Sequence, residues 1–249
     1  MGFIDKTGEI RKSNNCGLMK IVGYTNARNI KVKFKTGCIV KTTYQNFKNG
    51  AINDPLFLSV HGIGFIGNGE YKTTINSKLT IEYTTWHHMI QRCYDPYFIN
   101  KHLTYQDVTV CEEWLNFQNF AKWHQKNYYT LENIKLDKDI MKKGNKIYAP
   151  EFCSFVPKAI NMILVKSDKI RGKYPVGVCF IKASNKYKAQ IKVNGKQKHI
   201  GHFSTPEKAF WAYKIVKEKH IKVMANKYKE VLHTNVYNSL MNYEVEITD

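Results

Sequence analysis

Residues 174–228 constrain the fold more than any other part of the chain, because the spacing of their apolar residues changes once. In residues 187–193, apolar side chains alternate with lysine and glutamine, the period of a strand with one covered face. Thr205, Pro206 and Glu207 then supply an N-cap, a first-turn proline and a first-turn acid. Apolar residues recur at helical spacing after them. The sequence therefore predicts a small sheet covered on one face by one helix.

Three strands are predicted in this region, over residues 176–181, 187–193 and 198–203. Asn194 and Gly195 form a two-residue hairpin signal between the second and third strands. If the helix covers the apolar face, the other face of the second strand is polar. It carries Lys186, Lys188, Gln190 and Lys192.

The charge balance favours a polyanionic partner. The chain has 39 Lys and Arg against 20 Asp and Glu, a formal net charge of +19. Each Lys or Arg set against a phosphate releases condensed counterions, so nucleic acid is the leading candidate. A basic three-stranded face can enter the major groove, although an ordinary solvated sheet face gives the same pattern. A membrane surface is not expected, because neither a basic amphipathic helix with a bulky apolar face nor a lipidation signal is present.

The cellular compartment is predicted from what the sequence lacks. No apolar run approaches the roughly 20 residues that span a bilayer, and the first residues contain no hydrophobic signal region. We therefore expect an intracellular protein. The cysteines occur singly, without a C-x-x-C pair, so neither a zinc ribbon nor a disulfide framework is expected.

The fold class expected is α+β with several domains. Residues 1–75 are rich in glycine and β-branched residues, which predicts a small β-barrel-like or meander region. Residues 76–165 begin with aromatic residues at helical spacing, which favours buried helices over a base-stacking surface. A strand over residues 135–140, a loop, a strand over residues 152–156 and a helix over residues 158–164 follow.

Three polar residues stand at the corners of that strand-loop-strand-helix segment: Asp137, Asn145 and Asn161. Their oxygen atoms are the hard ligands that magnesium (Mg2+) prefers. Phosphodiester hydrolysis needs a Lewis acid to stabilise charge on the phosphate and a base to activate water. The segment therefore predicts a divalent-metal site, with turn and cap residues as the alternative reading.

The C-terminal region resembles the Apetala/ethylene-response-factor DNA-binding domain. The motifs that carry the likeness are Gly177-Val-Cys-Phe180, Tyr187-Lys-Ala-Gln-Ile-Lys192, Ile200-Gly-His-Phe203 and Thr205-Pro-Glu-Lys-Ala-Phe-Trp-Ala-Tyr213. The resemblance implies that the strands lie in the major groove of double-stranded DNA. It implies base contacts from Gln190, Lys192, Gln197 and His199, and we expect phosphate contacts from Lys182, Lys188 and Lys196. The family's first-strand arginine positions are here occupied by Val176, Cys179 and Ile181.

Nearly the whole chain resembles a group of phage-encoded HNH-like endonucleases. The motifs include Trp86-x-x-Met89-x-x-Arg92-Cys-Tyr94, Leu136-Asp-Lys-Asp-Ile140 and Gly144-Asn-Lys-Ile-Tyr148. The resemblance implies that Asp137 and Asn161 ligate magnesium or another divalent metal. It also implies that Asn145 orients the general base.

That general base is normally a histidine, and Lys138 stands in its place. An ordinary lysine is protonated at neutral pH and is a poor base. Asp139, or His87 or His88 brought close in space, are the candidate substitutes.

The domains expected are an N-terminal region over residues 1–75, an HNH-like domain over residues 76–165 and a DNA-binding domain over residues 174–230. The main hypothesis is a phage HNH-type homing endonuclease in the cytoplasm of a bacterial host. The alternative is a catalytically inactive DNA-binding regulator or anti-defence protein on the same scaffold. An RNA-binding protein is a third hypothesis. Double-stranded DNA is the expected partner, and no small-molecule cofactor is expected.

Overall fold

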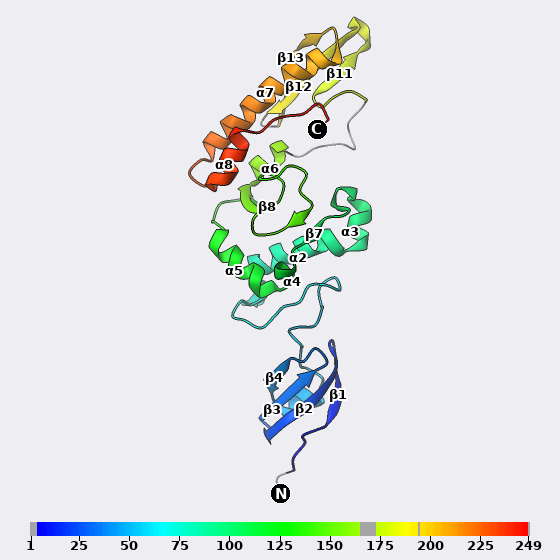
Figure 1. The fold of residues 1–249 in the computed structure, drawn as a ribbon, viewed down its shortest axis with the longest axis vertical. Coiled ribbons are helices and arrows are strands. Elements are labelled where there is room, and N and C mark those ends of the chain that lie inside the picture. Colours follow the sequence, from blue (N-terminus) through cyan, green and yellow to red (C-terminus); the bar gives the residue numbers. More distant parts are fainter. Residues whose placement is uncertain (1–3, 165–172, 194, 249) are drawn as a thin grey trace. The chain divides into compact units, whose positions relative to one another are not determined.

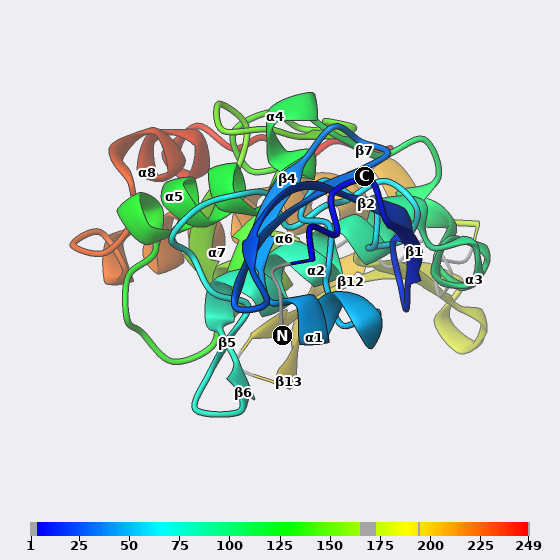
Figure 2. The ribbon, with the colours of Figure 1, turned by 90° about the horizontal axis from the view of Figure 1, so that it is seen from below.

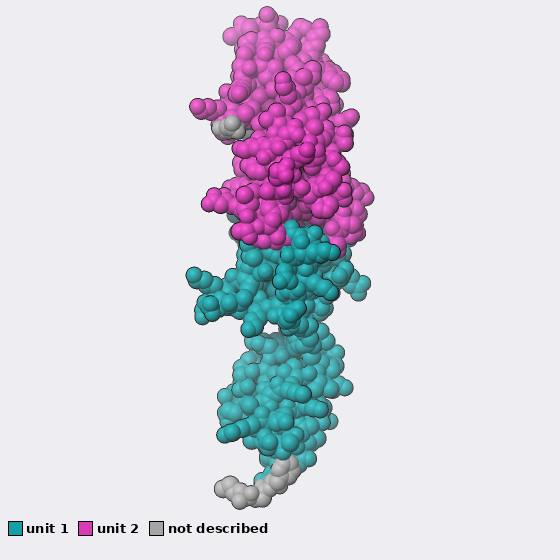
Figure 3. Space-filling model, turned by 90° about the vertical axis from the view of Figure 1, so that its left-hand side faces the viewer, with its two compact units in different colours: residues 1–127, 146–149 teal, residues 128–145, 150–249 magenta. Residues whose placement is uncertain are grey.

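The computed structural model of the protein describes residues 4–164, 173–193 and 195–248. Within them the chain is a mixed α+β protein with several small sheets and eight α-helices. It divides into two compact units, shown in different colours in Figure 3. Unit 1 comprises Met1–Asn127 and Lys146–Ala149, and unit 2 comprises Tyr128–Asn145 and Pro150–Asp249. No helix in the described ranges is long and apolar enough to cross a membrane.

Unit 1 begins with a four-stranded antiparallel sheet in the order β1-β2-β3-β4, coloured blue in Figures 1 and 2. The strands are β1 (Ile10–Ser13), β2 (Gly17–Asn26), β3 (Asn29–Phe34) and β4 (Ile39–Thr42), and helix α1 (Tyr44–Lys48) follows them. One face of the sheet and α1 enclose a core of Cys16, Met19, Ile21, Ile30, Val32, Phe34, Phe47 and Ile52. Thr43 begins α1 by accepting a hydrogen bond from the backbone N–H of Asn46.

The N-terminal region is a meander, as predicted, but its described strands do not close into a barrel. The sheet stays open because β1 and β4 are its two edges and pair only with β2 and β3. Phe47 of α1 is fully buried against the sheet. A short helix therefore covers the apolar face, so closure of the sheet is not needed to bury it.

The rest of unit 1 is mostly helical. It contains β5 (Thr74–Ile75), β6 (Lys78–Leu79), α2 (Ile81–Tyr94), α3 (Pro96–Lys101), the 3-10 helix η1 (Leu103–Tyr105), β7 (Thr109–Val110), α4 (Glu112–Leu115), α5 (Phe117–Asn127) and β9 (Ile147–Tyr148). The aromatic stripe predicted as core is buried, as Trp114, Phe117 and Phe120 show. Trp86 on α2 donates an indole hydrogen bond to the carbonyl of Trp114 at 2.7 Å, which joins the two helical segments.

We expect His124 on α5 to make the stability of unit 1 depend on pH. Burial lowers the pKa of His124 from 6.5 to about 4. Its neutral form is therefore favoured in the folded state. The contribution of the neutral imidazole to the free energy of unfolding is full above pH 6.5 and is lost as the pH falls towards 4. The whole change corresponds to about 3 kcal/mol. Urea unfolding followed by tryptophan fluorescence at pH 7 and pH 4.5 should show this loss, and His124→Gln should reduce it. Equal acid sensitivity in the variant contradicts the prediction.

Unit 2 begins with a ββα segment. Strand β8 (Ile134–Asp137) pairs antiparallel with β10 (Ser154–Pro157), and helix α6 (Lys158–Leu164) follows. A second sheet has the order β11-β12-β13, with β11 (Val178–Ile181), β12 (Lys186–Val193) and β13 (Lys196–Phe203), and the 3-10 helix η3 (Lys182–Ser184) lies between β11 and β12. Helix α7 (Pro206–Lys227) covers one face of this sheet, and α8 (Thr234–Met241) packs on α7. The predicted three strands and covering helix are confirmed, while Asn194 of the predicted hairpin lies outside the described residues.

One hydrophobic core runs through unit 2. Val156 and Ile160 of the ββα segment belong to the same buried cluster as Ile191 of β12 and Leu240 of α8. Removal of all residues after 171 would therefore expose the apolar side of β10 and α6 as well as deleting the C-terminal sheet. The domain boundaries expected at residues 165 and 174 stay predictions, and point substitutions are better probes of the C-terminal sheet than truncation.

Candidate nucleic-acid interface and metal centre

The strand register shows which side chains share the face of β11-β12-β13 that α7 leaves uncovered, called the open face below. Residues directly opposite each other on neighbouring strands project to the same side. Gln190 lies opposite His199, and Lys192 lies opposite Gln197. Ala189 and Ile191, which alternate with them along β12, are buried on the side of α7. The open face therefore carries amide, imidazole and ammonium groups.

A β-bulge in β13 adds a histidine that regular alternation does not predict. Ala189 pairs with Gly201 and Gln190 pairs with His199, so Ile200 is an extra residue in β13. His202, which lies opposite Lys188, thereby shares the open face with His199. The two imidazole rings are 4.6 Å apart. In the sequence, Gly201 was the only signal for this irregularity, since a glycine inside a strand often marks a bulge.

Most of the predicted DNA contacts gather on the open face: Lys188, Gln190, Lys192, Gln197 and His199. Two do not. Lys196 lies opposite Val193, which packs towards the core, and Lys182 belongs to η3. From β11, the open face receives Cys179 opposite Lys188, and Ile181 opposite Lys186. No Asp or Glu occurs between Asp168 and Glu207, so no acid from these strands offsets the lysines.

The predicted metal ligands Asp137 and Asn161 are in direct contact. Asp137 ends β8, and its Oδ1 accepts hydrogen bonds from the backbone N–H groups of Asp139 at 2.8 Å and Ile140 at 2.9 Å. Its Oδ2 accepts from Nδ2 of Asn161, on α6, at 2.7 Å. Burial raises the pKa of the Asp137 carboxyl, and the two backbone N–H groups act in the opposite direction.

Lys138 and Asn145 stand at the two ends of the loop that follows β8, and hydrogen bonds between them close this loop. The ammonium of Lys138 donates to Oδ1 of Asp139 at 2.7 Å and also to the carbonyl of Asn145. Nδ2 of Asn145 donates to the carbonyl of Lys138 at 2.9 Å. The Lys138 side chain is 9% exposed, against 52% for Asp139. Both of these hydrogen bonds of the Lys138 ammonium lie within this loop, so the side chain organises the loop.

His87 and His88 lie on α2 of unit 1, whereas Asp137 belongs to unit 2, so their proposed role beside Asp137 stays a prediction. The His87 ring is 5.3 Å from that of His61 and 6.2 Å from that of His88. Burial, together with these two neighbouring imidazoles, lowers the pKa of His87. Nδ1 of His61 is 3.3 Å from Oδ2 of Asp95. The sequence did not predict His61 as a neighbour of His87.

The contacts around Asp137 bear on the predicted magnesium site. The described residues contain no group of three or more His, Cys, Asp or Glu side chains placed to hold a metal ion. Asp137 and Asn161 form a different kind of set, with one carboxylate and one amide. Protein-bound magnesium commonly takes one or two carboxylates and completes its shell with water and substrate phosphate. In the structure Nδ2 of Asn161 faces Asp137, so the amide would have to turn to present its oxygen to a metal, and the magnesium site stays a prediction.

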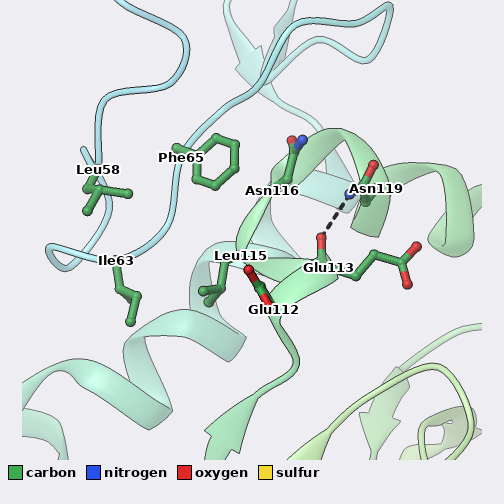
Figure 4. A pocket seen from close by; sticks show the side chains of 8 residues that line it. All are labelled: Leu58, Ile63, Phe65, Glu112, Glu113, Leu115, Asn116 and Asn119. Atoms are coloured by element: carbon green, nitrogen blue, oxygen red, sulfur yellow. Dashed lines mark hydrogen bonds between the residues drawn. The ribbon is translucent and has the colours of Figure 1, made fainter. Parts of the chain in front are cut away.

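A pocket of about 520 Å³ lies elsewhere, in unit 1, and Figure 4 shows its lining. Its walls are Leu58, Ile63, Phe65, Glu112, Glu113, Leu115, Asn116 and Asn119. Asn119 donates to the carbonyl of Glu113 at 3.0 Å, which fixes the start of α5 against α4. The lining includes two glutamates and none of the residues predicted for DNA or metal binding.

Comparison with protein-family models, with curated proteins and with solved structures finds no match to this chain. The resemblances to the two families of DNA-acting proteins therefore stay predictions.

Proposed function

We propose that this chain binds double-stranded DNA through the open face of β11-β12-β13. The observation that carries the proposal is the alignment of Lys188, Gln190 and Lys192 with the β13 side chains opposite them. Lysine ammonium groups bind phosphates, whereas glutamine and histidine present hydrogen-bonding groups to base edges. The Apetala/ethylene-response-factor likeness implies the same use of such a sheet, with its strands in the major groove.

The charge pattern favours this proposal over an ordinary solvated face. Solvated sheet faces usually mix both signs of charge, because opposite charges on neighbouring strands attract. Here the strands contribute lysines and no acid over the whole interval between Asp168 and Glu207. Phosphate groups supply the missing negative charge and release counterions when they do so.

The test is the affinity of the full chain for a fluorescent duplex at salt concentrations between about 50 and 200 mM. With three to five phosphate contacts, the logarithm of the association constant should fall linearly with that of the salt concentration, with a slope of about −3 to −5. Binding that is indifferent to salt, or absent at the lowest salt, contradicts the proposal.

A second candidate function, metal-dependent hydrolysis of phosphodiester bonds, is favoured by the contact between Asp137 and Asn161. The antiparallel β8-β10 pair followed by α6 has the strand and helix order expected of an HNH-like centre. Asn145 bonds the carbonyl of the residue at the base position, Lys138, as the resemblance to phage HNH-like endonucleases implies. Asp137 and Asn161 would hold the metal, which when bound supplies Lewis-acid stabilisation of charge on the phosphate.

Whether the chain cuts DNA or only binds it depends on which residue can act as the general base. Because the Lys138 ammonium is engaged by Asp139 and the carbonyl of Asn145, water activation in this proposal falls to Asp139, His87 or His88. Asp139 has an exposed carboxylate, but that carboxylate already accepts from Lys138. If none of the three residues acts, the chain is the inactive DNA-binding regulator or anti-defence protein considered above. Incubation of supercoiled plasmid with the protein and magnesium separates the two: open circles that EDTA prevents support hydrolysis, whereas binding without cleavage supports the inactive protein.

A further inference from the structure

The N-terminal sheet has a charge distribution that the proposed function does not use. No Asp or Glu occurs between Glu9 and Asp54. The same interval contains nine basic residues, namely Arg11, Lys12, Lys20, Arg28, Lys31, Lys33, Lys35, Lys41 and Lys48. This segment folds into β1-β2-β3-β4 and α1, so one small sheet carries a large excess of positive charge.

Five of these lysines share the face of the sheet that lies opposite its core, called the N-terminal lysine face below. Lys20 lies opposite Lys33, and Lys31 lies opposite Lys41. Lys12 lies opposite Leu18 at the other end of the sheet. All five are exposed, whereas the alternate residues of β2 and β3 form the buried core. Exposed aliphatic side chains stand between the lysines: Ile10, Leu18 and Ile39.

Folding brings like charges together on this face. Lysines directly opposite each other on neighbouring strands repel, and such pairs destabilise a sheet. None of these five lysines forms an ion pair with any residue that the structure describes. The repulsion is relieved when a polyanion lies across the strands, because its charges face two or more lysines at once.

We propose that the N-terminal lysine face is a second contact surface for the phosphate backbone of double-stranded DNA. The proposal rests on the function proposed above for the identity of the polyanion, but needs no contribution from the open face of β11-β12-β13. The lysine face offers ammonium groups and aliphatic side chains over most of its area, and its amide side chains, Asn26 and Asn29, are confined to the β2-β3 hairpin end. It is therefore a sequence-independent surface that adds affinity to the C-terminal sheet.

The experiment compares two variants of the full chain that lose equal charge. The first carries Lys20→Gln, Lys31→Gln, Lys33→Gln and Lys41→Gln. The control carries Lys72→Gln, Lys78→Gln, Lys122→Gln and Lys126→Gln, four exposed lysines of unit 1 outside the sheet. The probe is a fluorescent duplex of random sequence, titrated over a range of salt concentrations.

We expect the slope of log affinity against log salt to become shallower by about 3–4 in the first variant, close to 0.9 for each of the four lost phosphate contacts. Affinity at about 0.1 M salt should weaken by roughly tenfold or more, and the control should change much less. The thermal unfolding midpoint of the first variant should equal or exceed that of the wild type, because two like-charged pairs are gone. The double variant Lys20→Gln/Lys33→Gln repeats the test with a smaller change.

Two outcomes overturn the inference: an unchanged slope in a folded first variant, or equal losses in both variants. Loss of binding to phosphatidylserine vesicles without loss of duplex binding also overturns it and assigns the face to a membrane surface. A parallel variant of the open face keeps the two proposals apart. If only the open-face variant loses affinity, the proposed function stands and this inference fails. If only the variant of the N-terminal lysine face loses affinity, this inference stands and binding through the open face fails.

Discussion

Replacement of Gly177 by alanine is expected to lower the free energy of unfolding of unit 2 by about 2–4 kcal/mol. Gly177 has a φ of +77°, and a Cβ there would lie 2.2 Å from the ring of Tyr213. Tyr213 is buried on α7 within the shared core of unit 2, so its ring has little room to move. Alanine would therefore combine backbone strain with a steric clash, and would push the start of β11 away from α7.

Gly195→Ala is the matched control for this prediction. Gly195 has a φ of +79°, but a Cβ there would have no atom within 4 Å. It should lose only the backbone contribution, roughly 1 kcal/mol. Urea unfolding followed by circular dichroism measures both variants. Equal destabilisation by the two substitutions would show that the packing of Gly177 against Tyr213 is not tight.

Asp137→Asn is expected to abolish magnesium-dependent nicking if the ββα segment is a hydrolytic centre. Asparagine keeps the oxygen that accepts from the backbone of Asp139 and Ile140, so the turn after β8 is retained. It loses the negative charge that binds a divalent cation. Lewis-acid stabilisation contributes several kcal/mol, which makes the expected loss of rate on the order of a hundredfold or more.

Glu151→Gln removes the same charge from an exposed position in unit 2 and serves as the control. Initial rates of open-circle formation from supercoiled plasmid, measured with equal protein and magnesium concentrations, compare the two variants with the wild type. Duplex affinity should persist in Asp137→Asn, because the open face is unchanged. If Asp137→Asn nicks plasmid at the rate of the wild type, Asp137 is not part of a hydrolytic centre, and the DNA-binding proposal is unaffected.

The sequence predicted the C-terminal sheet well because its local signals agree. Alternation in β12, the cap at Thr205 and the proline at the start of α7 all indicate the same elements. The bulge at Ile200 was not predicted, because alternation carries no information about an extra residue in one strand. For that reason His202 was not predicted to share the open face with His199, whereas the strand bounds were nearly correct.

Long-range packing was the part that sequence patterns did not predict. The alternation of apolar and polar residues along β1-β2-β3-β4 is the same for an open sheet and a closed barrel. The sheet stays open because Phe47 of α1, a helix that was not predicted, covers its apolar face. Helix α8 was also missed, although Val236 and Leu240 have helical spacing. The roles of Asp137 and Lys138 depend on side-chain direction: one turns towards Asn161 and the other towards Asn145.

DNA binding by the open face of β11-β12-β13 is the proposal on which the others depend. The most direct measurement is the salt dependence of duplex affinity for a full-chain variant with Lys186→Gln, Lys188→Gln and Lys192→Gln. The control, with Lys219→Gln, Lys222→Gln and Lys229→Gln, removes equal charge from exposed positions on and just after α7. We expect a slope shallower by about 2–3 and affinity at least roughly tenfold weaker in the first variant alone. Equal affinities and slopes in the two folded variants would contradict it.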